Sequence, residues 1–357
     1  MQKIRYAVVG AGWISQEAFM PAVPQTDNSQ MTAIITGNEE AAAKLSNFYD
    51  IPHRFTYDRY DEALQSGLFD AVYIALPNHL HADYTIRALK RGIHALVEKP
   101  LASSIAECEA MIAAADESGA RLMTAYRLHC EPGTVEAIRL VSSGAIGEPR
   151  FFHGIFCDQM GSANHRLKAG AWGGPLPDMG VYCVNAARHL FGTEPVEAVA
   201  MGSRGDDPRF REIKEIDSAI LRFPGGGLAS FTASFNGAAV DTYRIVGTEG
   251  DLEMRPGLRF ETPTRMTLRR GKEVTETEFA DIDHFGAQTA YFSDCILQGK
   301  ASESDGAEGL ADMYALLAIE EAARTGRAQT ITSPPRPHHP HAGMVRMVDR
   351  TERRLLL

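Results

Sequence analysis

Lys99 is a positively charged side chain at a position where a ligand would be expected. Four apolar residues between positions 93 and 97 are too few for a helix and suit a buried strand. Pro100 cannot donate to a sheet ladder, so this strand should end there. Open α/β sheets bind their ligands at the carboxyl ends of the strands. A lysine that merely extends into solvent from a strand end is the alternative.

A second set of polar side chains follows one face of a predicted helix. Glycines and prolines at 173–177 lead into a helix that should begin near Asp178. Tyr182 and Asn185 follow one and two turns later, so a carboxylate, a phenol and an amide share a face. Carboxyl and phenol groups can exchange protons with a substrate. The alternative is that Asp178 serves only as the N-cap of the helix.

The sequence Gly10-Ala-Gly12-Trp-Ile-Ser15 has the spacing of a dinucleotide fingerprint and directly follows a predicted strand at 4–9. Gly10 permits the tight turn, and Gly12 lets the backbone approach a pyrophosphate. Ser15 replaces the third glycine with another small residue. We therefore expect a dinucleotide here, with Gly10, Gly12, Trp13 and Ile14 as contacts.

The second predicted strand, at 31–36, ends without the acidic residue that usually holds the ribose hydroxyls of NAD. Glu39 and Glu40 come only at the start of the next helix, which Asn38 should cap, and this capping explains the two glutamates equally well. A carboxylate at the strand end would repel a 2′-phosphate, so its absence favours NADP over NAD. The expected contacts of this half of the cofactor are Thr36, Gly37, Asn38 and Lys44, with Arg54 as a further candidate.

Strands and helices alternate regularly up to residue 125, which predicts a doubly wound parallel sheet. Further strands are expected at 54–57, 70–76 and 121–125, with one helix that begins at 38 and others at 58–67, 78–90 and 103–118. Asn78 should cap the third of these helices, which carries His79 and His81. Trp13, Pro77, Asn78 and Lys99 should share the ligand-binding edge of the sheet.

From residue 126 the pattern changes to longer strands joined by short connections, which indicates an α+β domain with a large, mostly antiparallel sheet. The predicted strands are 151–157, 196–203, 216–223, 228–235, 242–247, 265–270 and 273–279, and the predicted helices are 131–143, 179–191, 284–297 and 307–325. The domains are thus 1–125 and 126–330, with a tail at 331–357 that is Pro-rich, extended and solvated at 333–341.

Composition narrows the function classes. The formal net charge of −10 argues against nucleic acid or anionic membranes as partners, and no apolar run is long enough to span a bilayer. The five cysteines show no metal-ligand spacing, so we expect no metal site. An odd number of cysteines and a strand starting near residue 4 without a signal peptide favour the cytoplasm.

Glu98-Lys99-Pro100, Pro77-Asn78-His79-Leu80-His81 and Asp178-x-Gly-x-Tyr182 resemble motifs of the glucose–fructose oxidoreductase / inositol dehydrogenase family. The resemblance extends to about residue 327. It implies a dinucleotide-binding domain, an open-faced C-terminal sheet and NAD(P)-dependent oxidoreduction of a sugar, cyclitol or related polyol. Tyr182 stands where many members have His, and with Thr36-Gly37-Asn38 it looks more like the glucose–fructose oxidoreductase branch.

The resemblance also implies a set of site residues. Lys99, Asp178 and Tyr182 would form the catalytic group, in which Tyr182 moves the proton at the substrate oxygen while the cofactor carries the hydride. A neighbouring Lys99 would favour the phenolate form of Tyr182. Further expected cofactor contacts are Leu76, Pro77, Asn78, His81, Glu98, Lys99 and Arg127, and expected substrate contacts are Lys99, Tyr126, His129, Arg166, Trp172, Asp178 and Tyr182.

The family resemblance points to dimers or tetramers paired through the second sheet. One face of that sheet, with Phe231, Ala233 and Phe235 in alternation, needs a cover that the chain does not obviously supply. Two other functions remain open: a non-catalytic NAD(P)-binding sensor, and a glycosidase that uses tightly held NAD for transient oxidation.

Overall fold

The computed structural model describes residues 2–162, 164–260, 262–336 and 338–357. The chain divides into two compact units, and neither is one continuous stretch. The first comprises Met1–Glu131, Ile282–Gly309 and Met344–Leu357; the second comprises Pro132–Asp281 and Leu310–Gly343. Residues 282–309 and 344–357, which the sequence analysis placed in the second domain and the tail, therefore belong to the first unit. Position 337 of the Pro-rich segment lies outside the described residues.

Within the described residues, the first unit contains a six-stranded sheet in the order β3-β2-β1-β4-β5-β6, and its strand pairs are parallel. This confirms the doubly wound sheet, in which the strand order reverses beside β1. Its strands are β1 (Ile4–Val9), β2 (Ser29–Ile35), β3 (His53–Phe55), β4 (Ala71–Ile74), β5 (His94–Val97) and β6 (Leu122–Thr124).

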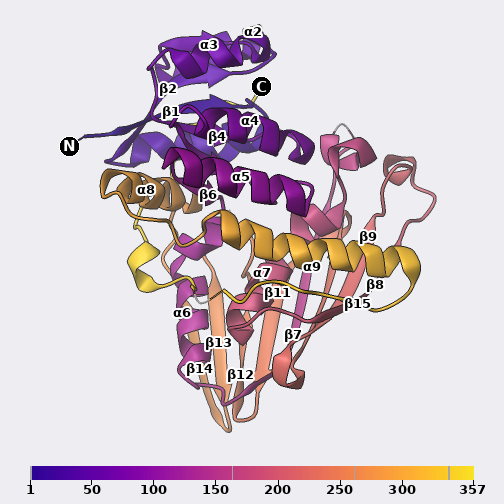
Figure 1. Ribbon diagram of the computed structural model, residues 1–357. Helices are drawn as coiled ribbons and strands as arrows, with labels where there is room; N and C mark the ends of the chain where they lie inside the picture. Colours follow the sequence, from indigo (N-terminus) through magenta and orange to yellow (C-terminus); the bar gives the residue numbers. More distant parts are fainter. Residues whose placement is uncertain (1, 163, 261, 337) are drawn as a thin grey trace. The chain divides into compact units, whose positions relative to one another are not determined.

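Helices pack on this sheet, and Figure 1 shows α4 and α5 side by side along it. Helix α5 starts with a capping box: the Ser104 hydroxyl accepts the N–H of Glu107, whose carboxylate accepts the N–H and hydroxyl of Ser103. Helix α8 contacts β1 and β2, and Tyr6 and Ser293 share a hydrogen bond. The helices of this unit are α1 (Met20–Ala22), α2 (Glu39–Tyr49), α3 (Tyr60–Gln65), α4 (His81–Leu89), α5 (Ile105–Ser118) and α8 (His284–Leu297).

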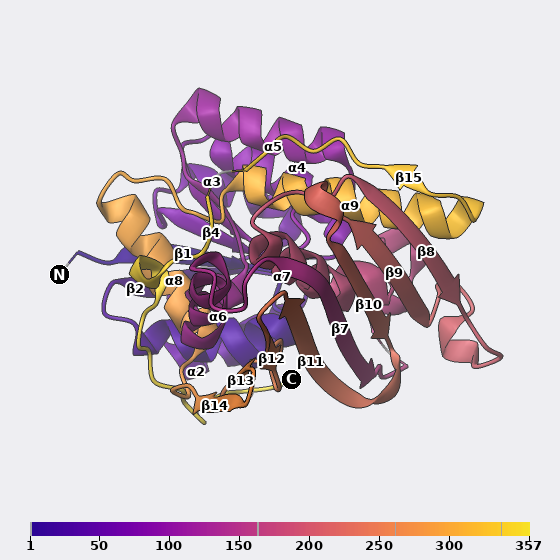
Figure 2. The ribbon, with the colours of Figure 1, turned by 90° about the horizontal axis from the view of Figure 1, so that it is seen from below.

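In the described part of the second unit, nine strands form a mixed sheet in the order β14-β13-β12-β11-β7-β10-β9-β8-β15. Figure 2 shows β8, β9, β10 and β7 as neighbours in this order. Only the β7–β10 pair is parallel among the strands described. The strands are β7 (Pro149–Gln159), β8 (Glu197–Ser203), β9 (Ile216–Arg222), β10 (Leu228–Ser234), β11 (Asn236–Gly247), β12 (Gly250–Met254), β13 (Arg265–Arg270), β14 (Glu273–Glu278) and β15 (Gln329–Thr330).

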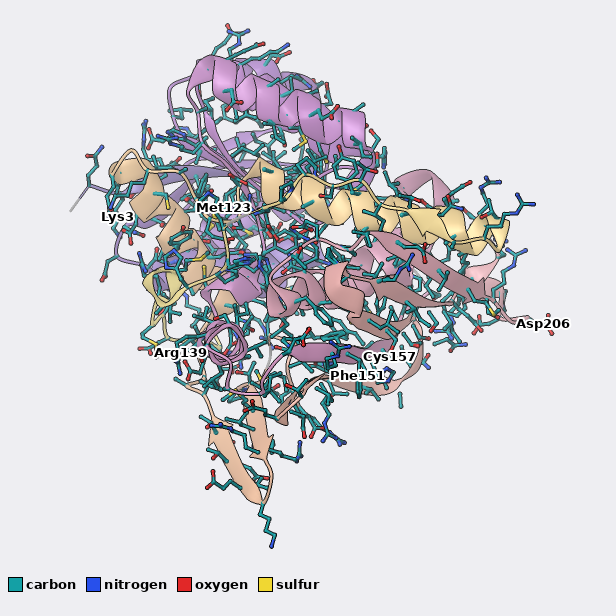
Figure 3. The ribbon with its side chains drawn as sticks, turned by 60° about the horizontal axis from the view of Figure 1, so that its bottom comes forward. Lys3, Met123, Arg139, Phe151, Cys157 and Asp206 are labelled. Atoms are coloured by element: carbon teal, nitrogen blue, oxygen red, sulfur yellow. The ribbon has the colours of Figure 1, made fainter. Side chains whose placement is uncertain are left out.

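The prediction that Phe231, Ala233 and Phe235 lie on the uncovered face of this sheet was wrong. Phe231, Ala233 and Phe235 are buried, and a methyl group built on Gly180 would touch the side chains of Phe231 and Ala233. The opposite face carries the exposed apolar side chains. Register places them on one face, because Leu228 pairs with Phe151 and Ile220 pairs with Val199. Figure 3 labels Phe151, which lies on β7. The exposed apolar set is Phe151, Val199, Met201, Ile220, Leu228 and Val240.

Among the residues that the structure describes, three helices accompany the second sheet: α6 (Pro132–Ser142), α7 (Val181–Phe191) and α9 (Gly306–Thr325), which enters this unit at Leu310. Arg188 on α7 is buried and forms ion pairs with Glu194 and Asp312. Breaking such a buried pair leaves an uncompensated charge, so this cluster fixes how α7 and α9 pack. None of the helices among the described residues has the length and hydropathy that a membrane span would need.

Candidate active site

The glycine loop after β1 is shaped for a dinucleotide. Gly10 has φ +96°, and a Cβ there would lie 2.4 Å from the carbonyl oxygen of Ala75, so only glycine fits. A Cβ on Gly12 would meet no atom within 4 Å. Gly12 therefore faces open space on the side where the fingerprint places a pyrophosphate. Trp13 is 54% exposed beside this loop. These features fit a bound dinucleotide.

Ser15 does more than keep a small residue in the third glycine place. Its hydroxyl donates to the carbonyl oxygen of Gly10 over 2.6 Å, within the buried base of the loop. The turn that it opens, η1 (Ser15–Phe19), is π-helical. The hydrogen bond closes the loop from within, so the loop keeps its shape without the third glycine.

The loop after β2 uses its side chains within the protein. Asn38 caps α2, and its side-chain oxygen accepts the N–H of Ala41 over 3.0 Å, which confirms the predicted cap. Thr36 is buried, and Gly37 lies against the ring of Tyr57. The exposed Lys44 pairs with Glu40 over 2.6 Å. A phosphate reaching Lys44 would have to compete with this exposed pair, which is worth little.

His81 does not have the expected role of a cofactor contact. It is fully buried, and its Nδ1 and Nε2 atoms lie 2.9 Å and 2.8 Å from the carbonyl oxygens of Pro100 and Leu76. Burial lowers the pKa of His81, so the neutral ring donates to one of these two oxygens. His81 thus joins the loops that follow β4 and β5. Asn78 is not the cap of α4, because it lies in a 3₁₀ turn (η4, Asn78–Leu80) that precedes the helix.

Glu98 and Lys99 follow β5 as predicted, and Lys99 is half-buried. The Tyr73 hydroxyl donates to Oε1 of Glu98 over 2.7 Å. Burial raises the pKa of the Glu98 carboxyl, while the Lys99 ammonium and the Tyr73 hydroxyl oppose this rise. The Tyr73 ring in turn stacks on Phe19 of η1. Tyr73 and Phe19 were missed in the sequence, since a strand tyrosine and a helix phenylalanine look like ordinary core residues.

Tyr126, Arg127 and His129 all have buried side chains. Tyr126 stacks on His129, whose Nδ1 lies 2.9 Å from Glu303. Arg127 Nη1 lies 3.2 Å from Nδ1 of His284 on α8. Burial, followed by the Arg127 charge, holds the pKa of His284 well below its ordinary value. These contacts hold the segment after β6 against α8, which local sequence patterns could not reveal.

The three polar residues that the sequence places on one helix face, Asp178, Tyr182 and Asn185, each contact a different residue. Asp178 lies in a π-helical turn, η8 (Leu176–Gly180), rather than at a cap, and pairs with Arg166 over 3.0 Å. The ring of Tyr182 meets that of Phe156 edge to face. Asn185 donates to Asp312 over 3.0 Å. Helix α7 itself begins only at Val181, and so the Asp178 cap was wrong.

Trp172 and Arg166 come from the segment before this turn. Trp172 has φ +49°, and its indole N–H lies 3.3 Å from Glu320. Lys99 with the glycine loop belongs to the first unit, whereas Arg166, Trp172, Asp178 and Tyr182 belong to the second. The residues that the sequence predicts for the site therefore belong to two different units.

Residues 4–126 match the family described as "Oxidoreductase family, NAD-binding Rossmann fold", and residues 134–253 match the "GFO/IDH/MocA C-terminal domain". D-xylose 1-dehydrogenase [NADP(+)] of Haloarcula marismortui is 32% identical over 330 residues, which are 90% of this chain and 91% of that protein. This chain belongs to the GFO/IDH/MocA oxidoreductase family. The three motifs had predicted this membership correctly.

Two solved structures of similar chains agree with this one over nearly its whole length. The aldose-aldose oxidoreductase of Caulobacter crescentus, complexed with glycerol, has a TM-score of 0.88 and 34% identity, over 92% of this chain and 100% of that one. A 3-ketoreductase of Actinomadura kijaniata with NADP and TDP-benzene has a TM-score of 0.81 and 26% identity, over 90% and 98%. Like other members of the family, this protein is an NAD(P)-dependent oxidoreductase.

Proposed function

We propose that the protein transfers a hydride between a nicotinamide and the carbinol or carbonyl carbon of a sugar, cyclitol or related polyol, with aldoses as the first class to test. The observation that carries this proposal is the open space at Gly12 in the same unit as Lys99, which follows β5, the strand beside β4. Both features belong to the carboxyl edge of the sheet. The xylose dehydrogenase and the aldose-aldose oxidoreductase support aldoses as substrates.

In this proposal a bound nicotinamide would supply the hydride chemistry. Tyr182 takes or gives the proton at the substrate hydroxyl oxygen, and Lys99 binds that oxygen. Asp178 orients the substrate and remains tied to Arg166. The pairing with Arg166 suits a positioning role, because a guanidinium fixes the orientation of the carboxylate that it binds.

We propose NADP(H) as the preferred cofactor. No carboxylate ends β2, and the Asn38 side chain is occupied as a helix cap. A 2′-phosphate would therefore be bound at the loop 36–38, with Arg54 on β3 as the candidate cation because β3 pairs with β2. The NADP named for the xylose dehydrogenase and for the ketoreductase supports this choice.

The test is a panel of aldoses, ketoses, cyclitols and diols assayed separately with NAD⁺ and NADP⁺. We expect turnover of at least one sugar or polyol, faster with NADP⁺. Tight cofactor binding without turnover of any compound would favour a sensor, and hydrolysis of a glycoside without net change in the cofactor would favour a glycosidase. Either result would overturn the proposed reaction.

We further propose a cytoplasmic homodimer or homotetramer that pairs through the open face of the second sheet. Met201 is 76% exposed and Phe151 is 49% exposed on that face, which makes a self-complementary apolar surface plausible for two copies. Free thiols at the cysteines suit a reducing compartment. Light scattering that gives a monomer mass at micromolar concentration would contradict the oligomer.

A further inference from the structure

Residues 351–357 contact the turn that follows the glycine loop. The Gln16 side chain is 5% exposed and joins two parts of the chain that are far apart in sequence. Its Nε2 atom donates to the carbonyl oxygen of Ala11 over 2.6 Å, and its Oε1 atom accepts the N–H of Leu357 over 2.7 Å. Ala11 is the central residue of the glycine loop. One amide therefore connects this loop to residues 351–357.

Two arginines fasten the same segment. Arg354 pairs with Glu17 of η1 over 2.9 Å, and the Glu17 carboxylate is largely buried. Arg353 donates to the carbonyl oxygen of Phe48 over 3.1 Å and lies over the Phe48 ring. Phe48 lies in the last turn of α2, whose first turn follows the loop at 36–38. Residues 351–357 thus bind both helical elements that begin at the expected cofactor loops.

The Ala11 contact has a geometric consequence for Gly12. A trans peptide is planar, so the carbonyl of Ala11 and the N–H of Gly12 point in opposite directions. Gln16 holds that carbonyl on the protein side of the loop. The N–H of Gly12 is thereby directed away from Gln16. A Cβ on Gly12 would meet no atom within 4 Å, so space is open at this residue.

We propose that Gln16, held by residues 351–357, is a positioning residue that presets the 11–12 peptide for the cofactor pyrophosphate. The inference rests on the proposed NADP(H) binding. Gln16 lies within the matched range 4–126, whereas residues 351–357 lie outside both matched ranges, 4–126 and 134–253. Gln16 does not touch the substrate, so its effect falls on cofactor affinity and leaves the sugar side unchanged.

The test compares Gln16→Met, which keeps the size of the side chain and removes both hydrogen bonds, with Gln65→Met on the exposed face of α3 as control. The readouts are the Kd of NADPH without sugar, the sugar KM at saturating cofactor, and Tm. We expect Gln16→Met to raise the NADPH Kd about tenfold, the usual scale for one lost hydrogen bond. The sugar KM should stay within about twofold of wild type.

Arg354→Ala probes the segment without altering the loop, and Arg91→Ala at an exposed turn is its matched control. We expect Arg354→Ala to raise the NADPH Kd. The NADPH Kd of the Arg354→Ala, Gln16→Met double variant should be only slightly higher than that of Gln16→Met, because both changes remove the restraint on the same 11–12 peptide. The second variant keeps the test decisive if Gln16→Met fails to fold.

An NADPH Kd unchanged in Gln16→Met and Arg354→Ala, against tight wild-type binding, would overturn the inference alone. So would a rise in sugar KM equal to the rise in Kd, or a fall in Tm without a change in Kd. A wild-type protein that binds neither NADPH nor NADH would overturn the proposed function and this inference with it.

Discussion

The Tyr73 hydroxyl donates to Oε1 of Glu98 over 2.7 Å, so the pair joins β4 to the segment that carries Lys99. The Tyr73 ring also stacks on Phe19, with ring centroids 3.7 Å apart. Tyr73 thus links the turn after the glycine loop to the residue that precedes Lys99. A side chain that looked like core packing in the sequence connects the two parts of the ligand-binding edge.

Tyr73→Phe keeps the ring stacking and removes the hydrogen bond. We expect a loss of about 1 kcal/mol in the free energy of unfolding and a several-fold fall in kcat, because Glu98 no longer holds its orientation next to Lys99. Tyr60→Phe is the control: its hydroxyl donates to the carbonyl oxygen of Tyr84 instead. Urea unfolding and steady-state kinetics measure both. An equal fall in kcat for the two variants would show that only general stability matters.

Gly12→Val should abolish cofactor binding while the protein stays folded. The structure places no protein atom within 4 Å of a Cβ at this position, so the new side chain enters only the space reserved for the pyrophosphate. Gly10→Ala makes the contrasting variant, because its Cβ would clash with the Ala75 carbonyl and its φ is positive. It should unfold at lower temperature. If folded Gly12→Val protein still binds NADPH with wild-type affinity, the pyrophosphate does not lie at the glycine loop.

Asn38→Asp should shift preference from NADP toward NAD. Aspartate caps a helix as well as asparagine, so α2 should remain intact while the new charge repels a 2′-phosphate. Asn38→Ser, a neutral cap, is the matched control and should change the preference little. The ratio of kcat/KM for the two cofactors reports the shift. Wild-type protein that uses NAD at least as well as NADP would refute this expectation.

Tyr182→Phe should lower kcat by about 10² or more, the usual scale for a positioned acid or base, with cofactor affinity nearly unchanged. The phenyl ring can keep its edge-to-face contact with Phe156, so the fold should survive. Lys99→Ala should cost at least as much. The double variant should be little worse than the worse single variant, as for residues that act as a unit. Near wild-type kcat in Tyr182→Phe would remove Tyr182 from the mechanism.

Acid should destabilise the first unit through His284. Burial and the Arg127 charge hold the pKa of His284 well below its unfolded value, so below about pH 6.5 the unfolded chain binds a proton that the native state excludes. Stability then falls as pH falls, by up to about 1.4 kcal/mol per pH unit for this group. His284→Asn should flatten the slope measured by urea unfolding between pH 7 and 5. His79→Asn, at an exposed position, should not.

Local chemistry explains which elements could be predicted. The N-cap of α2 at Asn38 depends on residues within one turn, and so the sequence could reveal it. The strand at 250–254 was missed because it is short and carries two acidic residues. The face of Phe231 was misjudged because alternation shows which residues share a face, but not which face the helices cover.

The candidate site divides in the same way. The glycine loop and the end of β5 could be predicted because glycine and proline restrict the backbone wherever they occur. The contact of His81 with Leu76 and Pro100 could not, since a buried histidine and a ligand-binding histidine look alike in one sequence. Asp178 pairs with Arg166 twelve residues earlier, and no helical or strand period links those positions.

The discontinuous first unit constrains how the chain can fold during synthesis. Tyr6 and Ser29 bond to Ser293, and residues 344–357 complete the unit, so these partners emerge long after β1. At a synthesis rate of roughly 10 residues per second, β1 waits on the order of half a minute for α8. Residues 132–281 can form their own sheet in that interval. A fragment that stops at residue 131 would expose the side of the sheet that α8 covers, so dividing the gene there should give an insoluble half.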